Sequence, residues 1–259
     1  MASLRDKKGF ICDMDGVIYH GNKLVEGSKE FVEWLKKQGK KFIFLTNSSA
    51  KSPKELEQKL SHMGIEVDAD HFITSAQATA SFLASQNPSA GVYVIGESGL
   101  ISALHDAGFY IDTVSPKYVV VGETRTYNFE QMELAVQLVL NGAKLIGTNS
   151  DLTGPSEKGV VPACRALVAP IELATGRKAY FIGKPNPLIM RHAVKTISCD
   201  REDTLVIGDR MDTDIVAGIE SGIETALVLS GITKIEDLTY YPYQPNYILN
   251  RAADIITMD

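Results

Sequence analysis

Two carboxylates stand one residue apart near the start of the sequence, directly after an apolar run. The stretch FICDMDGVIYHG contains Asp13 and Asp15, and the residues before them have the apolar character of a buried strand. Because like charges at this spacing repel each other, the pair needs compensation from a bound cation, from a reaction, or from both. An isolated pair of this kind is also common in solvated turns, so other residues must decide between these interpretations.

Polar side chains follow three other apolar runs. Thr46 and Asn47 follow one of them, Lys184 follows the second, and Asp209 and Asp214 follow the third. In an open parallel sheet, ligands bind outside the carboxyl ends of the strands, so we expect the fold to gather these groups at one edge. Carboxylates suit a divalent cation, while a hydroxyl and a lysine suit an anion. This combination is what phosphoryl transfer requires, since its catalysis is mainly positioning and charge neutralisation.

Strand-like runs alternate with helical patterns along the whole chain of 259 residues. The clearest helix signal is SPKELEQKLSHMG, with Ser52 as N-cap, Pro53 at the first helical position, Glu55 completing a capping box and Gly64 after the end. The strand-like runs are almost continuously apolar. This alternation predicts an α/β architecture with parallel sheets covered on both faces.

Composition limits the classes of partner. The net charge is −6 and no basic stripe is present, which argues against a nucleic-acid polymer as partner. The N-terminal residues lack the apolar stretch of a signal peptide, and no run approaches the ~18 apolar residues of a membrane helix. The three cysteines are odd in number and far apart, and no histidine spacing suggests zinc. We therefore expect a cytoplasmic protein with reduced cysteines and no membrane partner.

Four motifs carry a family resemblance. DMDGV, LTNSS, GKPNP and GDRMDTD, in this order, resemble the four motifs of the haloacid dehalogenase-like hydrolase superfamily. The similarity is closest to its NagD-type phosphatases and continues through GETRTYN and GTNSD. The resemblance implies a Rossmann-like parallel-sheet core, residues 1–87 and 181–259, with an inserted α/β cap domain, residues 88–180.

The resemblance also implies catalytic roles. Asp13 would be the nucleophile, which is already ionised at neutral pH and forms a hydrolysable aspartyl-phosphate. Asp15 would be the general acid for the leaving oxygen and then the general base for water. Gly16 would permit the tight backbone after this pair.

By the same resemblance, Mg²⁺ would be bound by Asp13, Asp209 and the backbone carbonyl of Asp15. Asp214 would support the metal directly or through water, and it could also be the N-cap of the following helix. Asp212 lies between them, and we interpret it as a loop or cap residue.

Thr46 and the backbone N–H of Asn47 would bind a phosphoryl oxygen, and Lys184 would neutralise both nucleophile and phosphate. Taken alone, the first two residues would suit an ordinary strand-to-helix turn, and the lysine a solvated charge. Only the whole set of motifs favours the functional interpretation.

Two sets of residues are candidates for contacting the rest of the substrate. Asn149 and Asp151 follow a strand of the predicted cap and are expected to be exposed there, although Asn-Ser-Asp is also a generic turn. Tyr19, His20 and Asn22, after the nucleophile, form a second set.

These expectations combine into a Mg²⁺-dependent phosphatase that hydrolyses small phosphomonoesters, such as nucleoside monophosphates or sugar phosphates. A phosphotransferase or phosphomutase would use the same residues, and a phospho-accepting switch module is a third alternative. The physiological substrate and the oligomeric state, a homo-oligomer included, stay open.

Overall fold

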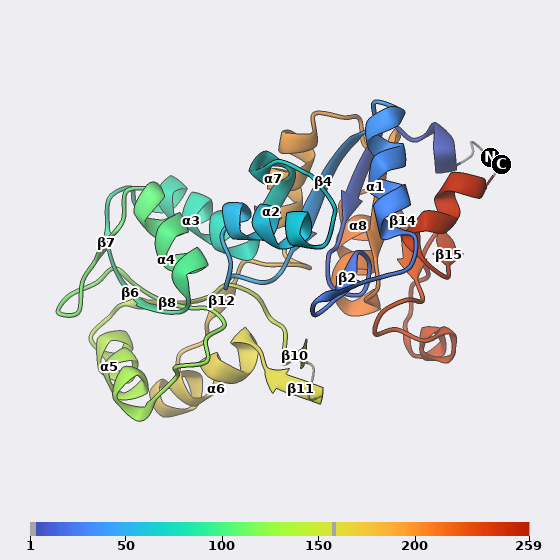
Figure 1. Cartoon of the computed structure of the whole chain (residues 1–259). Coiled ribbons are helices and arrows are strands. Elements are labelled where there is room, and N and C mark those ends of the chain that lie inside the picture. Colours follow the sequence, from blue (N-terminus) through green and yellow to red (C-terminus); the bar gives the residue numbers. More distant parts are fainter. Residues whose placement is uncertain (1–3, 157–158, 259) are drawn as a thin grey trace. The chain divides into compact units, whose positions relative to one another are not determined.

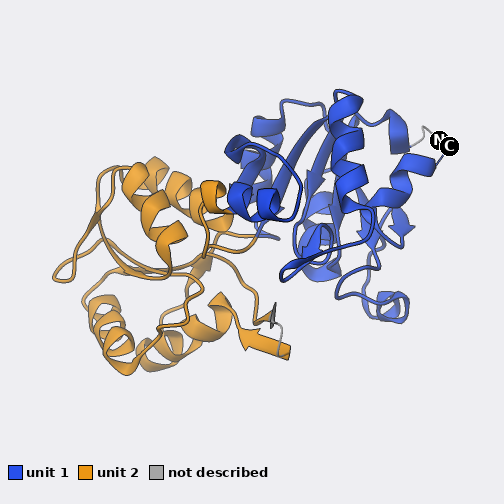
Figure 2. Ribbon diagram, viewed as in Figure 1, with its two compact units in different colours: residues 1–46, 56–73, 184–259 blue, residues 47–55, 74–183 orange. Residues whose placement is uncertain are grey.

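The computed structural model describes residues 4–156 and 159–258, and the chain forms two compact units (Figures 1 and 2). Unit 1 consists of residues 1–46, 56–73 and 184–259, and unit 2 of residues 47–55 and 74–183. The predicted domain boundaries differ from this division, because they place residues 47–55, 74–87 and 181–183 with the core. Which division corresponds to independently folding domains stays a prediction.

Unit 1 is built on a six-stranded sheet with the order β15-β14-β13-β1-β4-β5. Its strands are β1 (Gly9–Cys12), β4 (Lys41–Thr46), β5 (Phe72–Thr74), β13 (Thr204–Gly208), β14 (Glu224–Val228) and β15 (Tyr247–Leu249). Strand β1 runs parallel to β4 on one side and to β13 on the other. The chain first builds the sheet outward from β1 through β4 and later resumes on the opposite side with β13. The strand order therefore reverses between β1 and β13, which is where open α/β sheets bind ligands.

Aromatic packing anchors β1 in this sheet. Helix α1 (Ser28–Lys37) places Phe31 and Trp34 edge-on against Phe10 of β1, with ring centroids 6.3 and 5.8 Å away. All four residues of β1 are buried, and helix α7 (Pro187–Ile197) contacts both β1 and β4. Rigid packing of this kind fixes where the chain leaves β1, immediately before Asp13.

Several shorter elements complete unit 1. They are the ribbon of β2 (Tyr19–His20) and β3 (Lys23–Leu24), helix α8 (Val216–Glu220), the π-helical turn Met211–Ile215, and the 3₁₀ turns Leu4–Asp6, Ala69–His71, Ile235–Tyr240 and Ala252–Thr257. Helix α2 (Pro53–His62) begins in the residues of unit 2 and continues into those of unit 1.

Unit 2 has a second parallel sheet, with the order β12-β9-β8-β6-β7. Its strands are β6 (Gly91–Ile95), β7 (Tyr110–Ile111), β8 (Tyr118–Val121), β9 (Lys144–Gly147) and β12 (Tyr180–Phe181). Its helices are α3 (Ser75–Gln86), α4 (Ser98–Asp106), α5 (Phe129–Leu140) and α6 (Cys164–Thr175). An antiparallel ribbon joins β10 (Thr153–Ser156) to β11 (Gly159–Pro162). The buried side chains of β8, such as Val119 and Val121, form a core with α5 and α6.

The α/β architecture with parallel sheets is confirmed, and so is the capping box of α2. The Ser52 N–H donates to Glu55 Oε2 at 2.7 Å, and the Glu55 N–H donates back to Ser52 Oγ at 3.3 Å. Gly16 has a φ of +83°, which only glycine adopts readily. The three cysteines are free thiols, as expected.

One prediction about the sheet is wrong. The strand before Lys184 was expected to end at the same edge as β1, but β12 pairs with β9 in the sheet of unit 2. Lys184 is instead the first residue after the chain returns to unit 1, ahead of α7.

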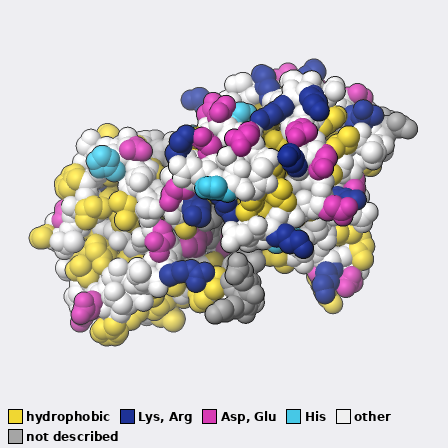
Figure 3. Space-filling model, in the orientation of Figure 1, with side chains coloured by type: hydrophobic (Ala, Val, Ile, Leu, Met, Phe, Trp, Pro, Cys, Tyr) yellow, Lys and Arg dark blue, Asp and Glu magenta, His cyan; other side chains and the backbone are white. Residues whose placement is uncertain are grey.

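The described residues include no helix that is both long and apolar enough to cross a membrane. On the face of unit 1 shown in Figure 3, lysine and arginine side chains are interspersed with aspartate and glutamate.

Candidate active site

The first residue after β1 and the first residue of the returning chain form the centre of the site. Lys184 Nζ lies 2.6 Å from Asp13 Oδ1 and 2.6 Å from Asp214 Oδ1, and it also donates to the Leu45 carbonyl at 3.0 Å. Lys184 is only 3% exposed. The Asp13 N–H donates to the carbonyl of Ile207 in β13, which holds it at the junction of the two strands. The structure thus brings together three predicted residues that are distant in the sequence.

A third carboxylate completes the cluster. Asp13, Asp209 and Asp214 each offer a carboxylate oxygen, and these oxygens lie within 4.8 Å of one another. Asp209 directly follows β13, and its Oδ2 accepts from the Ile232 N–H at 2.8 Å. Two of these three carboxylates contact Lys184 and the third lies close to both, so acidic groups outnumber basic ones in the cluster.

The electrostatics reflect this imbalance. Burial raises the pKa of Asp13 well above its usual range, with Asp214 and Asp209 adding to the effect and Lys184 opposing it. Burial and the charge of Asp214 likewise raise the pKa of Asp209 to about 7. Burial alone would lower the pKa of Lys184, yet Asp13 and Asp214 raise it above its ordinary value. The lysine is therefore charged, and the carboxylates still repel one another. A cation bound by these oxygens would relieve that repulsion, so the donor set fits a hard divalent ion.

Three glycines let the backbone approach these carboxylates closely. A Cβ at Gly208 would overlap the side chain of Asp214, and a Cβ at Gly231 or Gly16 would overlap that of Asp209. Neither Gly208 nor Gly231 was assigned a role from the sequence. Gly208 is the first residue of the motif GDRMDTD, which could have drawn attention to it, whereas Gly231 has no local signal.

Asp15 lies at the turn that follows. Burial raises its pKa, and the nearby ammonium group of Lys59 is the largest opposing influence. Lys59 comes from α2, and its Nζ lies 3.4 Å from the centre of the Tyr19 ring. Sequence reasoning missed Lys59, because nothing in the spacing of α2 distinguishes it from a surface lysine. Within the second candidate set, Tyr19 is buried, while His20 and Asn22 are exposed.

Asp212 and Asp214 differ in their surroundings. Asp212 is exposed and pairs with Arg210 at 2.8 Å, in agreement with its interpretation as a loop residue. Asp214 is buried inside the π-helical turn, where its Oδ2 accepts from the Arg210 N–H at 3.2 Å. It is therefore not the N-cap of α8, since that position belongs to Ile215.

Thr46 and Asn47 are adjacent in the chain but belong to different units. Thr46 is the last residue of β4 and is 5% exposed. The Asn47 carbonyl accepts from Ser75 Oγ at 2.5 Å and from Asn149 Nδ2 at 2.7 Å, and its own amide donates to Asp151 Oδ2 at 3.1 Å. These bonds fix the peptide that follows Thr46.

The expected exposure of Asn149 is wrong. Its side chain is fully buried, and its hydrogen-bonding groups are satisfied there. It donates to Asn47 and Glu123 and accepts from the Asp151 N–H at 3.1 Å. Asp151 is partly exposed, so a contact of Asp151 with the substrate stays a prediction.

Comparisons with known proteins agree with this geometry. A family described as haloacid dehalogenase-like hydrolase matches residues 10–110, and a second, described as HAD-hydrolase-like, matches residues 181–255. The dihydroxyacetone phosphatase of Corynebacterium glutamicum is 44% identical, over 95% of this chain and 90% of that protein. The ribonucleotide monophosphatase NagD of Escherichia coli is 42% identical, over 96% of this chain and 98% of its own.

Among solved structures, the 4-nitrophenylphosphatase of Thermotoga maritima superposes with a TM-score of 0.94 at 33% identity, covering 99% of both chains. Sequence identity over nearly the full length, together with the same fold, shows more than a shared architecture. The chain belongs to the haloacid dehalogenase-like hydrolase family, among its NagD-type phosphatases.

Proposed function

We propose that this protein is a Mg²⁺-dependent phosphatase that hydrolyses small phosphomonoesters through an aspartyl-phosphate on Asp13. The observation that carries the proposal is the buried cluster of Asp13, Lys184, Asp209 and Asp214 at the point where the strand order reverses. The relatives are named dihydroxyacetone phosphatase, ribonucleotide monophosphatase and acid sugar phosphatase. All three names describe hydrolysis of a small phosphate ester, which supports the same reaction for this protein. They differ in the alcohol that carries the phosphate, so they do not identify the alcohol of its substrate.

Asp13 acts as the nucleophile. One of its oxygens attacks phosphorus while the bond from phosphorus to the ester oxygen breaks, which leaves the phosphoryl group on Asp13. Lys184, 2.6 Å from Asp13 Oδ1, orients this carboxylate and offsets the charge of the phosphate. The Leu45 carbonyl and Asp214 hold the lysine in place, so its ammonium is oriented before the substrate arrives.

Asp15 moves the protons. It donates a proton to the leaving alkoxide in the first step and accepts one from the attacking water in the second. A carboxyl group can serve as an acid at neutral pH only when its pKa is raised, and burial raises that of Asp15. Hydrolysis then returns Asp13 and Asp15 to their starting states and releases inorganic phosphate.

Asp13, Asp209 and the backbone carbonyl of Asp15 would hold the Mg²⁺, and Asp214 would support it directly or through water. When bound, the ion lowers the repulsion between an anionic nucleophile and a dianionic phosphate. Thr46 Oγ1 and the Asn47 N–H would bind the phosphoryl oxygens.

Phosphate release from p-nitrophenyl phosphate and from a panel of nucleotides and sugar phosphates tests the proposal. Release should require Mg²⁺, and Asp13→Asn should reduce it at least about a thousandfold, because the amide is not a nucleophile. The matched control is Asp212→Asn, the same change on an exposed neighbour, which should retain wild-type rates. Retained turnover in Asp13→Asn would remove the nucleophile from the proposal.

Two alternative functions use the same residues. A phosphotransferase or phosphomutase would pass the phosphoryl group to an alcohol, so adding an alcohol should yield a new ester at the expense of free phosphate. A phospho-accepting switch module needs a persistent aspartyl-phosphate, which an acid and base at Asp15 opposes. A lifetime of minutes or longer after quenching would favour the switch.

We further propose that the core and cap correspond to the predicted residues 1–87 with 181–259 and 88–180, and that the protein is cytoplasmic. Limited proteolysis that cuts near residues 88 and 180 would support these boundaries, whereas cuts near residues 47 and 74 would support the division by compact units.

A further inference from the structure

We propose that Glu123 in unit 2 is a positioning residue for the phosphate-binding segment that begins at Asn47. The inference rests on the proposed function, because it concerns how the Asn47 N–H is held for the phosphate. Glu123 follows β8, in the stretch GETRTYN, and it belongs to none of the four catalytic motifs.

One carboxylate oxygen of Glu123 binds Ser49. Its Oε2 accepts from the Ser49 N–H at 2.9 Å and from the Ser49 hydroxyl. The same Ser49 oxygen accepts from the Glu123 N–H at 3.2 Å and from Thr148 Oγ1 at 3.2 Å. The serine is fully buried, and these bonds use its hydroxyl both as donor and as acceptor. Glu123 therefore ties the segment after β4 to the ends of strands β8 and β9.

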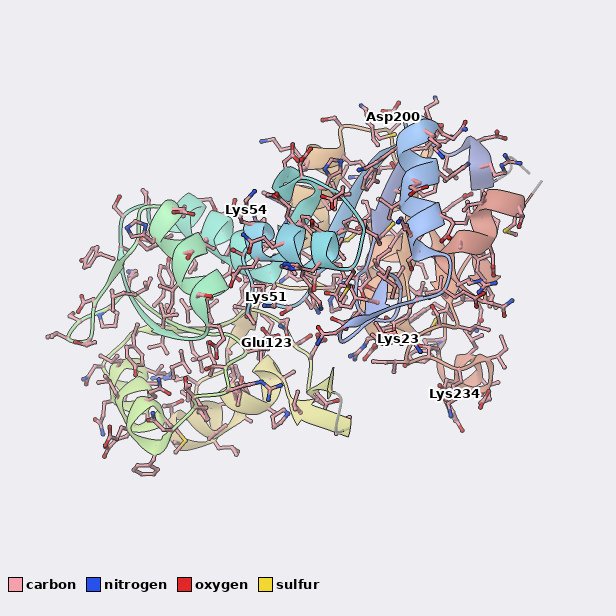
Figure 4. The ribbon with its side chains drawn as sticks, in the orientation of Figure 1. Lys23, Lys51, Lys54, Glu123, Asp200 and Lys234 are labelled. Atoms are coloured by element: carbon pink, nitrogen blue, oxygen red, sulfur yellow. The ribbon has the colours of Figure 1, made fainter. Side chains whose placement is uncertain are left out.

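The other oxygen binds Asn149. Glu123 Oε1 accepts from Asn149 Nδ2, and the same amide group donates to the Asn47 carbonyl at 2.7 Å. Ser75 Oγ donates to that carbonyl as well, at 2.5 Å. The segment from Asn47 to Ser49 is thus held at both ends. Glu123 binds Ser49 directly, and it binds Asn47 through Asn149. Figure 4 shows Glu123 in the same part of unit 2 as Lys51, two residues after Ser49.

Close packing leaves this segment little freedom. A Cβ at Gly122 would lie 2.5 Å from Ser49 Oγ, and a Cβ at Gly183 would lie 2.7 Å from Asn47 Oδ1. A Cβ at Gly99 would lie 2.5 Å from the carbonyl carbon of Lys51. Gly122 and Gly183 lie in loops of unit 2 and Gly99 lies in the first turn of α4, and none of the three has a positive φ. Their small size lets the segment lie directly against the backbone.

Two covalent links connect this network to the proposed phosphate ligands. Asn47 is bonded to Thr46, and Gly183 is bonded to Lys184. Gly183 is itself held by its N–H, which donates to the Thr148 carbonyl at 2.8 Å. A shift of the Asn47 peptide would therefore move the N–H proposed to bind phosphate, and small misplacements of such groups are costly.

Glu123→Gln breaks the network with almost no change in size. The carboxylate only accepts hydrogen bonds, but the glutamine amide brings an NH₂ group in place of one oxygen. That group would face either the Ser49 N–H or Asn149 Nδ2, which are both donors. One donor is therefore left without its acceptor in either orientation of the amide.

The experiment compares Glu123→Gln with the matched control Glu172→Gln. Glu172 is a buried carboxylate of unit 2, whereas Glu123 is half-buried; Glu172 accepts from the Ala179 N–H at 2.8 Å and pairs with Arg165 at 2.9 Å. With p-nitrophenyl phosphate and Mg²⁺, we expect Glu123→Gln to raise KM, and the inhibition constant of inorganic phosphate, by about tenfold each. We expect the fold decrease in kcat to be smaller than the fold increase in KM or in the phosphate inhibition constant. The control should leave all three within about twofold of the wild type.

Amide hydrogen exchange gives a readout that does not depend on activity. Peptides that contain Ser49 should exchange faster in Glu123→Gln than in the wild type or the control. Unchanged exchange at Ser49, or a KM and phosphate inhibition constant equal to those of Glu172→Gln, would overturn the inference. If the wild type released no phosphate at all, the proposed function would fail, while the exchange result would still report on the network.

Should Glu123→Gln not fold, Ser49→Ala tests the same inference more gently. It removes the hydroxyl but keeps the N–H that donates to Glu123. The same constants should rise, by about threefold, and an unchanged phosphate inhibition constant would contradict the positioning role.

Discussion

The two units carry polar residues at the carboxyl edges of their parallel sheets, but the two edges are built differently. In unit 1, Asp13 and Asp214 share Lys184, and Asp209 adds a third carboxylate within 4.8 Å of theirs, so the acidic groups outnumber the lysine. In unit 2, Ser49, Thr148 and Asn149 are fully buried within a hydrogen-bond network around one carboxylate, that of Glu123.

The difference separates a site from a structural junction. Buried polar groups that satisfy one another stabilise a fold and leave nothing to bind a ligand. Buried like charges cost stability, and a fold retains them where a ligand or a reaction uses them. Polar residues at a strand end are thus a weak indicator of a site, whereas an unbalanced cluster of them is a strong one.

The largest effect should come from removing the lysine that contacts two carboxylates of the unit 1 cluster. Lys184→Met should reduce kcat/KM by about a thousandfold, because the nucleophile and the phosphate lose the charge that lies between them. Phosphate release with p-nitrophenyl phosphate measures it. The control is Lys8→Met, which removes an exposed lysine paired with Asp203 at 2.6 Å and should leave kcat/KM unchanged. Equal activity in both variants would mean that the balance of charge in the cluster is irrelevant to the reaction.

In unit 2, breaking the closed network should cost stability. Asn149→Ala removes a buried donor to the Asn47 carbonyl and leaves the half-buried Glu123 Oε1 without that partner. We expect the free energy of unfolding to fall by about 2 kcal/mol, as measured by urea denaturation. An unchanged free energy of unfolding would indicate that these hydrogen bonds do not stabilise the protein in solution. The proposed difference between the two sheet edges would then be wrong.

In unit 1, removing a carboxylate from the cluster should increase the stability of the metal-free protein, in contrast to the loss expected for Asn149→Ala. Without metal, folded Asp209 keeps its proton up to about pH 7, whereas in the unfolded chain it loses it near pH 4. The folded state therefore binds more protons between these values, so the stabilisation that Asp209 contributes is lost as pH rises through this window.

Asp209→Asn cannot lose a proton, so in EDTA it should become more stable than the wild type as pH rises from about 4 to 7, by about 1–2 kcal/mol. Saturating Mg²⁺ should stabilise the wild type and reverse the order of the two proteins. Urea denaturation at several pH values, with EDTA or Mg²⁺, measures both effects. A stability difference that does not change with pH would show that Asp209 is not under the strain inferred for it.

The sequence by itself determined much of the local structure and the identity of the chemical groups. Some features depend only on residues close together in the chain, so the local sequence pattern predicts them. They are the alternation of strands and helices, the capping box at Ser52 and Glu55, and the turn at Gly16. Four motifs in order also indicated which carboxylates and which lysine belong together, even though Asp13 and Lys184, for example, are 171 residues apart.

Only the tertiary structure decided which polar groups at the strand ends are satisfied by hydrogen bonds and which lie among like charges. Asn149 and Asp209 both follow a buried strand, yet one is satisfied by Asn47 and Glu123 while the other lies among like charges. It also decided that Lys184 reaches Asp13 from a chain returning out of the other sheet, and that Lys59 lies beside Tyr19. The physical reason is that hydrogen bonding and electrostatic repulsion depend on distances between atoms, and folding sets these distances between residues that no local pattern connects.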